Sequence, residues 1–412
     1  MDRASRSRRH FLKVASRWSV ALGGVALLRA TLPVDELMAL GLLGPEGTSL
    51  RNLLKQAPRA RYWTSTTQKS ADCAACHGST AVRPSHQHKH AIVKCQLCAH
   101  RCTIEEGQRG RCRARINAGG ELKSLVYGRP ITEHVDPIEK KPFYHFLPGS
   151  EAYSLATSGC PLRCKFCQNW QISQASPEDY AVDFTSAGEI AARAGQRRAR
   201  VVAFTYNEPT VFIEYLTDIA RAARRSGLRS VLVSCGFMNQ EPLQEMIEVL
   251  DGIKIDLKGF SPEFYRNVTS SELAPVLRSI KQVAAAKRHL EIVNLVVPTL
   301  NDSPAMLGEL SRWIAGELGP DVPIHFTRFH PDYQLQNLPP TPVATLERAR
   351  DAAMKQGIHY AYVGNVPGHP GNHTYCPSCG KVCIERSGFF VVSMTMKNGR
   401  CPCGTRIAGV WS

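Results

Sequence analysis

The chain is organised around residues 158–169, which read Ser-Gly-Cys-Pro-Leu-Arg-Cys-Lys-Phe-Cys-Gln-Asn. Cys160, Cys164 and Cys167 are therefore spaced Cys-x3-Cys-x2-Cys. Cysteine thiolates hold iron-sulfur clusters, and ordinary ferredoxin-type clusters use four of them. Three thiolates from one short loop leave the fourth iron without a protein ligand. The spacing predicts a 4Fe-4S cluster with one iron open to a small molecule.

The length and the cysteine distribution predict one core domain with small metal modules. The chain has 412 residues, so we expect a core of roughly 200 to 250 residues with smaller additions. Fourteen of its 15 cysteines fall into groups that are close in sequence, and Cys235 stands alone. Recurring Cys-x2-Cys pairs indicate metal sites rather than a disulfide framework.

The net charge of +16 is concentrated near the N-terminus. The first 115 residues contain 20 Lys or Arg and 7 Asp or Glu, so the remainder is nearly neutral. Such a basic arm can contact nucleic acid or anionic lipid. Aromatic residues do not alternate with the basic ones here, which makes nucleic acid the weaker interpretation.

Residues 1–32 are predicted to be an export signal of the twin-arginine type. Arg8 and Arg9 precede Phe11, and the mildly apolar residues 20–28 follow. A basic tail without a targeting role is the alternative. The sequence has no run of about 18 to 20 apolar residues, so we predict no transmembrane helix.

Residues 33–92 are polar and are predicted to be a linker that carries a Cys-x2-Cys-His motif. Cys73, Cys76 and His77 match the attachment motif for a covalent c-type haem, and three further histidines follow at positions 86, 88 and 90. Haem attachment occurs on unfolded chains, whereas the twin-arginine route exports folded ones. A covalent haem, another metal and a linker without any site all stay open, with haem the least favoured of the three.

Residues 93–148 contain a four-cysteine knuckle. Cys95, Cys98, Cys102 and Cys112 lie close together in sequence. Four thiolates suit a tetrahedral zinc ion or an auxiliary iron-sulfur cluster equally well, so both metals remain possible.

Residues 371–412 contain paired cysteines that are typical of a zinc ribbon. Cys376 and Cys379 precede Cys401 and Cys403 by about twenty residues. Cys383 lies between the pairs and is not needed as a ligand. We predict zinc and a mainly structural role, with docking of a partner or substrate as the alternative.

Between these modules the sequence alternates between short apolar runs and helical patterns. This order predicts a parallel sheet with helical crossovers, whose functional residues follow the C-terminal ends of the strands. The predicted strands are 152–157, 201–205, 230–234, 252–257, 290–297, 324–329 and 359–363. The predicted helices are 188–199, 211–225, 241–250, 275–286, 306–317 and 345–356.

The cysteine triad, with Phe166 before its last member, resembles the signature of the radical S-adenosylmethionine (SAM) superfamily. The resemblance implies an α/β fold with a partial (β/α)6 barrel at residues 149–370. It also implies that the open iron binds SAM, which a reduced cluster splits to a 5'-deoxyadenosyl radical. An electron donor such as a ferredoxin or flavodoxin would be a partner.

Further stretches are similar to the AmmeMemoRadiSam radical SAM enzymes, the AmrS family, which are related to pyruvate formate-lyase activating enzymes. This likeness covers about residues 93–412 and adds other AmmeMemoRadiSam proteins as candidate partners. The matching stretches are Asp136 to Pro142, Cys167 to Trp170, Thr205 to Thr210, Asp256 to Phe260 and Tyr362 to Gly368.

The resemblance also implies which residues bind SAM. Asn207 and Glu208 occupy the place of the motif for the SAM amino group, although Glu208 could instead be an exposed loop acid. Asp256 and Lys258 share one face of a strand and would contact SAM, or else form an ion pair that braces the barrel. The remaining candidate is His330, which follows the sixth strand and could equally be structural.

One stretch departs from the family pattern. Ser234-Cys235-Gly236-Phe237 stands where relatives more often have Thr-Asn-Gly. Gly236 still permits close approach of the backbone to the cofactor, whereas a side-chain contact to the ribose is in doubt. Cys235 is interpreted as a small buried residue rather than a fourth ligand.

Three rival functions remain from sequence. A glycyl-radical-enzyme activase would act on a glycine of a large partner protein. An envelope iron-sulfur or haem electron-transfer protein would not use SAM, and a nucleic-acid-modifying enzyme would bind with a steep salt dependence. The compartment is also open, because the export signal favours the envelope and SAM chemistry favours the cytoplasm.

Overall fold

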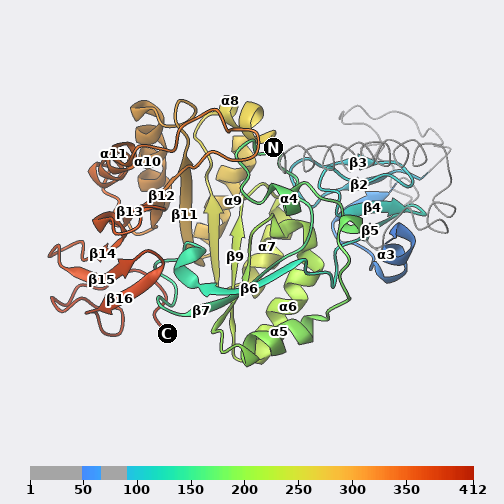
Figure 1. Cartoon of the computed structure of the whole chain (residues 1–412), viewed down its shortest axis with the longest axis horizontal. Coiled ribbons are helices and arrows are strands. Elements are labelled where there is room, and N and C mark those ends of the chain that lie inside the picture. The colour runs from blue at the N-terminus through green and yellow to red at the C-terminus, as the bar shows by residue number, and fades with distance from the viewer. Residues whose placement is uncertain (1–48, 66–90) are drawn as a thin grey trace, which may run out of the picture. The chain divides into compact units, whose positions relative to one another are not determined.

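The largest element of the fold is a twisted sheet with helices packed against it (Figure 1). The structure is a computed structural model that describes residues 49–65 and 91–412. The proposed signal of residues 1–32 and the motif from Cys73 to His77 lie outside the described residues, as do the three histidines that follow it.

In the described part of the chain, this sheet has eight strands in the order β13-β12-β11-β10-β9-β8-β7-β6. Strands β7 to β13 run parallel, and β6 pairs antiparallel with β7. The parallel α/β prediction is therefore confirmed, and each predicted strand overlaps an observed one. The bounds are β6 (Thr132–Pro137), β7 (Glu151–Ala156), β8 (Val201–Phe204), β9 (Arg229–Ser234), β10 (Gly252–Asp256), β11 (His289–Val296), β12 (Ile324–Arg328) and β13 (Ala361–Gly364).

The helices begin where the sequence supplies capping residues. Ser186 and Glu189 form a reciprocal capping box at the start of α5, and Ser303 caps α10 with Pro304 in its first turn. No helix among the described residues is long and apolar enough to cross a membrane. The helices between the parallel strands are α5 (Ala187–Gln196), α6 (Ile213–Arg225), α7 (Gln240–Val249), α9 (Leu273–Ala285), α10 (Pro304–Leu318) and α11 (Val343–Lys355).

The four-cysteine module packs against this α/β core through one buried and one partly exposed ion pair. Arg115 is fully buried and pairs with Glu214 of α6, while Arg61 pairs with Glu245 of α7. Such pairs are stable only when both charges are satisfied, so they fix how the module is placed. The module comprises α3 (Leu50–Gln56), β1 (Trp63–Ser65), β2 (Val93–Cys95), β3 (Thr103–Ile104), β4 (Arg115–Ala118) and β5 (Glu121–Ser124).

The C-terminal residues form a small three-stranded antiparallel sheet. It consists of β14 (Thr374–Tyr375), β15 (Val382–Ser387) and β16 (Phe390–Met394). Buried side chains of this sheet contact Tyr144, Tyr360 and Tyr362 in a separate apolar cluster. This small sheet, called the C-terminal ribbon below, thereby packs against β13, an edge strand of the main sheet.

Candidate active site

The cysteine loop leaves the C-terminal end of β7 and is held by backbone hydrogen bonds. The amide of Arg163 donates to the carbonyl of Thr269 at 3.0 Å, and the amide of Lys165 donates to that of Val268 at 3.0 Å. The thiols of Cys160, Cys164 and Cys167 are free and line one cavity of about 540 Å³. The three thiols thus lie where the parallel strands end, the usual place for a site in such folds.

Asn207 follows β8 and fastens the cysteine loop to it. Its side-chain amide donates to the carbonyl oxygens of Thr157 and Gly159 at 2.7 and 2.8 Å. Its Oδ1 atom is buried and has no hydrogen-bond partner among the described residues. Because Asn207 also lines the cavity, this oxygen is an available acceptor for a ligand.

Glu208 is buried at 2% exposure, so the interpretation as an exposed loop acid is wrong. Its Oε1 atom accepts hydrogen bonds from the hydroxyls of Thr210 and Ser234, at 2.5 and 2.8 Å. Its Oε2 atom accepts the backbone amide of Cys235 at 2.7 Å. Glu208 therefore ties the end of β8 to the end of β9 and sets the wall of the cavity.

Asp256 lies between two lysines at the end of β10. Lys254 donates to Oδ1, and Lys258 donates to Oδ2 at 3.1 Å. Burial by itself raises the pKa of Asp256, but the two ammonium groups outweigh it and lower the pKa to about 2. Lys258 also lies 5.7 Å from the centre of the Phe166 ring. The predicted pair of Asp256 and Lys258 is thus an ion pair that faces the cavity.

Lys254 was missed by the sequence reasoning, although a signal for it was present. Lys254, Asp256 and Lys258 alternate along the chain, and alternate residues of a strand share one face. Lys254 is buried and lines the cavity. A run of three charged residues at alternate positions of an otherwise apolar strand could have identified it.

Two other predicted residues, His330 and Gly236, are not part of the cavity lining. His330 is exposed and does not line the cavity, whereas His325 and Thr327 of β12 do. Gly236 has a φ of +70°, and a β-carbon there would lie 2.9 Å from Ile255. Gly236 therefore serves the turn after β9, while the neighbouring Cys235 lines the cavity.

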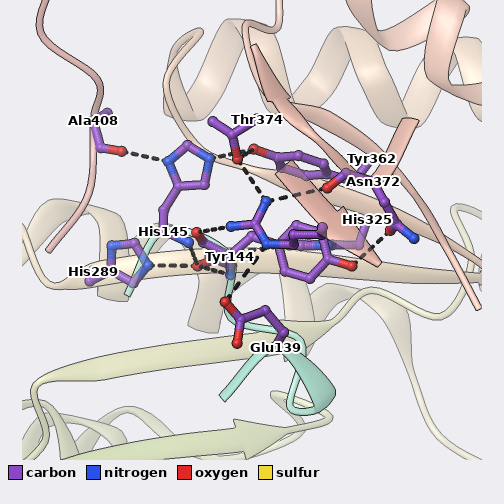
Figure 2. Close-up of polar contacts among 11 residues, drawn as sticks. Glu139, Tyr144, His145, His289, His325, Tyr362, Asn372, Thr374 and Ala408 are labelled. Carbon is purple, nitrogen blue, oxygen red and sulfur yellow. Dashed lines mark hydrogen bonds and ion pairs between the residues drawn. The ribbon is translucent and has the colours of Figure 1, made fainter. Parts of the chain in front are cut away.

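The residues behind the cavity form the buried polar network drawn in Figure 2. Glu291 of β11 accepts hydrogen bonds from the backbone amides of Tyr144 and His145, and pairs with His289 and His325. These hydrogen bonds outweigh burial and hold the pKa of Glu291 well below its usual range. His325, Tyr144 and Glu139 also line the cavity, so the network fixes that wall.

Arg386 brings the C-terminal ribbon into the same network. It donates to the carbonyl oxygen of Tyr144 at 2.8 Å and to the hydroxyl of Thr374 at 2.9 Å, and it lies 3.7 Å from Glu139. Both charged side chains are fully buried. The ribbon is therefore fixed to the segment before the cysteine loop.

Lys141, which lines the cavity, is paired with Asp136. Asp136 of β6 accepts hydrogen bonds from Lys141 at 2.6 Å and from the hydroxyl of Tyr206 at 2.7 Å. Burial lowers the pKa of Lys141 to about 8, despite the carboxylate beside it. The predicted stretch from Asp136 to Pro142 thereby contributes Lys141 to the cavity lining.

The donor chemistry of this cavity fits an iron-sulfur cluster with a zwitterionic ligand. Three free thiols lie at one side, Lys258 supplies a cation, and Asn207 presents an unpaired oxygen. The volume lies within the range of about 300 to 1,000 Å³ that is usual for small-molecule sites. The group that such residues hold when loaded would be the 4Fe-4S cluster, with SAM on its open iron.

The C-terminal cysteines are spaced for a single metal ion. Cys376 lies 3.6 Å from Cys403, and Cys379 lies 3.6 Å from Cys401, measured between sulfur atoms. Tetrahedral zinc with Zn–S bonds of about 2.3 Å places its sulfurs about 3.8 Å apart. The four sulfurs lie within 4.8 Å of one another, so this group fits metal binding.

Comparisons with known proteins agree with this geometry. The Radical SAM superfamily matches residues 154–310. "Uncharacterized protein MJ0808" of Methanocaldococcus jannaschii is 41% identical over 318 residues, which is 76% of this chain and 95% of that protein.

Activating enzymes are more distant relatives. The pyruvate formate-lyase-activating enzyme of Listeria monocytogenes is 26% identical over 38% of this chain and 66% of its own length. Pyruvate formate-lyase 1-activating enzyme of Escherichia coli is 24% identical over 48% of this chain and 87% of its own length.

Proposed function

This chain belongs to the radical SAM superfamily, and we propose that it cleaves SAM reductively and abstracts a hydrogen atom from a substrate. The family implies a 4Fe-4S cluster and SAM, and these supply an electron and the 5'-deoxyadenosyl radical. One observation carries the proposal: Cys160, Cys164 and Cys167 line the same cavity as Asn207, Asp256 and Lys258.

The residues of the chain would bind and orient SAM. The carboxylate of SAM would pair with Lys258, which Asp256 holds in place and which Lys254 reaches only through Asp256. The ammonium group would donate to the buried Oδ1 atom of Asn207. Glu208 would shape the site without contacting SAM, because its carboxylate oxygens already accept hydrogen bonds from Thr210, Ser234 and Cys235.

Exclusion of water would be the other contribution of the protein. A carbon radical reacts with any nearby hydrogen donor, so the substrate must lie close and solvent must be kept away. Val293 and Leu295 of β11 and Phe166 supply apolar walls. Phe389 reaches the cavity from the C-terminal ribbon, so this module would help to close the site.

Within the superfamily, we propose an enzyme of the AmrS type with a small module at each end of the barrel. The support is the series of matching stretches, together with the two cysteine modules that the structure packs against the core. A glycyl-radical-enzyme activase is the second candidate, because relatives at 24% and 26% identity are activating enzymes. A glycine-containing partner protein would then be the substrate.

The decisive test is anaerobic reconstitution with iron and sulfide, followed by dithionite reduction with and without SAM. We expect 5'-deoxyadenosine and a SAM-dependent change in the EPR signal of the cluster. Cys164→Ala should abolish both, while Cys235→Ala, which removes another thiol of the same cavity, should keep the bound iron. A reduced cluster that is indifferent to SAM would reject the proposal in favour of an electron-transfer protein.

A further inference from the structure

The three cysteine sets differ in how closely their sulfur atoms approach one another. Among the described residues, Cys376, Cys379, Cys401 and Cys403 form the one group of three or more His, Cys, Asp or Glu side chains placed to hold a metal ion, and their ligand atoms lie within 4.8 Å of one another. The thiols of the N-terminal set, at positions 95, 98, 102 and 112, are equally free but do not converge in this way.

The arrangement of the sulfur atoms distinguishes a site for one metal ion from a site for an iron-sulfur cluster. Four sulfurs around one zinc ion must lie about 3.8 Å apart, as they nearly do in the C-terminal set. In a four-iron cluster each thiolate binds a different iron, so the sulfurs stay farther apart. Cys160, Cys164 and Cys167, the set for which the family implies such a cluster, likewise form no single-ion group among the described residues.

The N-terminal set is nevertheless compact enough for one cluster. The backbone amide of Cys95 donates to the carbonyl oxygen of Cys102 at 2.9 Å, so these two cysteines lie side by side. Cys95 is buried in the main apolar core, Cys102 and Cys112 are partly buried and pack against it, and Cys98 is partly buried. Arg115, three residues after Cys112, is fully buried and pairs with Glu214.

This set also lies directly against the catalytic cysteine loop. A β-carbon built on Gly159 would be 2.3 Å from the carbonyl oxygen of Cys112, so these two backbones touch. The next residue along the chain from Gly159 is the ligand Cys160. His100 and Arg111 bind the carbonyl oxygen of Pro161, at 3.0 and 3.2 Å.

Cys98, another member of the set, is held by residues that follow β9. The backbone of Cys98 pairs with Met238, and the side chain of Asn239 donates to the carbonyl oxygen of Cys98 at 3.1 Å. The four-cysteine set is thus held at a constant position against the loops after β7 and β9.

We propose that Cys95, Cys98, Cys102 and Cys112 hold a second iron-sulfur cluster that relays electrons to the cluster at Cys160, Cys164 and Cys167. A low-potential one-electron donor is oxidised by one electron, the second cluster is reduced and then reoxidised, and the catalytic cluster gains that electron. The destination of the electron rests on the proposed function, whereas the metal content does not.

Metal analysis tests the first part of the proposal, that the N-terminal set holds an iron-sulfur cluster. A variant with Cys160, Cys164 and Cys167 all changed to Ala should bind about four irons and four sulfides per chain after reconstitution. Its EPR signal should not respond to SAM. Adding Cys98→Ala should remove this iron and leave the zinc content unchanged. If the first variant binds no iron, the proposal is overturned, whether or not an additional zinc ion is found.

A second variant guards against misfolding of the triple substitution. Cys112→Ser in the otherwise unchanged chain should lower the iron content by about half and retain a SAM-dependent EPR signal. Iron content equal to that of the unchanged chain would overturn the assignment. Because SAM responsiveness is scored separately, failure of the proposed function is distinguishable from failure of this inference.

The relay itself is tested by reduction kinetics. With a reduced ferredoxin as donor, the Cys112→Ser protein should reduce its catalytic cluster at least ten-fold more slowly, measured by freeze-quench EPR. Cys383→Ala, which removes a buried thiol outside the set and outside the cavity lining, should leave that rate unaltered. An equal rate in the Cys112→Ser protein and the unchanged chain would overturn the relay.

Discussion

The carbonyl oxygen of Cys112 faces the α-carbon of Gly159 so closely that a β-carbon at position 159 would lie 2.3 Å from it. Gly159 also has a φ of +92°, which side chains rarely adopt. One glycine thus permits both the turn into the catalytic loop and the contact with the four-cysteine module.

Replacing Gly159 with Ala should therefore destabilise the protein and lower its iron content. Gly227→Ala is the matched control, since its φ is +74° but nothing lies within 4 Å of the new carbon. The control should cost about 1 to 2 kcal/mol from backbone strain alone. Gly159→Ala should cost about 2 kcal/mol more because of the clash. Chemical denaturation and iron analysis measure both, and equal losses would contradict the contact.

Replacing Asp256 with Asn should leave Lys254 and Lys258 buried beside a neutral group. The folded-state pKa of Asp256, about 2, lies below its unfolded value of 3.8. The charged form therefore adds stability above about pH 4, and this gain disappears as the pH falls through 2. We expect a difference of about 2 kcal/mol between wild type and variant above pH 5.

The measurement for Asp256 is the free energy of unfolding as a function of pH, together with SAM affinity. Glu317→Gln, which breaks an exposed pair with Lys281, is the control and should change stability by less than about 1 kcal/mol. A pH-independent difference for Asp256→Asn would argue against the charge assignment.

Replacing Glu208 with Gln should distort the wall of the cavity. The amide nitrogen of Gln cannot accept a hydrogen bond from Thr210, Ser234 or Cys235, so one buried donor loses its partner. We expect a loss of about 1 to 3 kcal/mol and weaker SAM binding in calorimetry. Glu309→Gln, on the exposed face of α10, should change neither quantity.

Changing Glu291 to Gln should weaken the network of Figure 2. Its carboxylate accepts two backbone amides and pairs with His289 and His325, so a neutral amide leaves buried groups unsatisfied. We expect a loss of about 3 kcal/mol in unfolding experiments. Asp321→Asn, which breaks the exposed pair with His359, should cost under about 1 kcal/mol.

The C-terminal set should bind one zinc ion per chain. Cys401→Ser should remove it, since Cys401 lies 3.6 Å from Cys379 within the group of four. Cys383→Ala should keep the zinc, because this buried cysteine is not part of that group. Mass spectrometry of metals compares the two variants, and zinc retained in Cys401→Ser would contradict the assignment.

The sequence alone predicted the α/β fold class, which the parallel sheet confirms, and the candidate cluster cysteines. Strands such as Val201–Phe204 are buried throughout, so their unbroken apolar runs identified a parallel sheet. Cys160, Cys164 and Cys167 lie close together along the chain, so their spacing predicts an iron-sulfur site without any tertiary contact. The alternation of Asp256 and Lys258 also placed both on one strand face.

Only the tertiary structure decided which distant residues meet around these cysteines. Glu208 reaches Ser234 and Cys235 on the next strand, and His325 rather than His330 lies in the cavity wall. Such contacts depend on strand register and on which side chain a loop turns inward, and neither leaves a local pattern. The contact of Cys112 with Gly159 joins positions 47 residues apart, so only the folded backbone brings the two cysteine sets together.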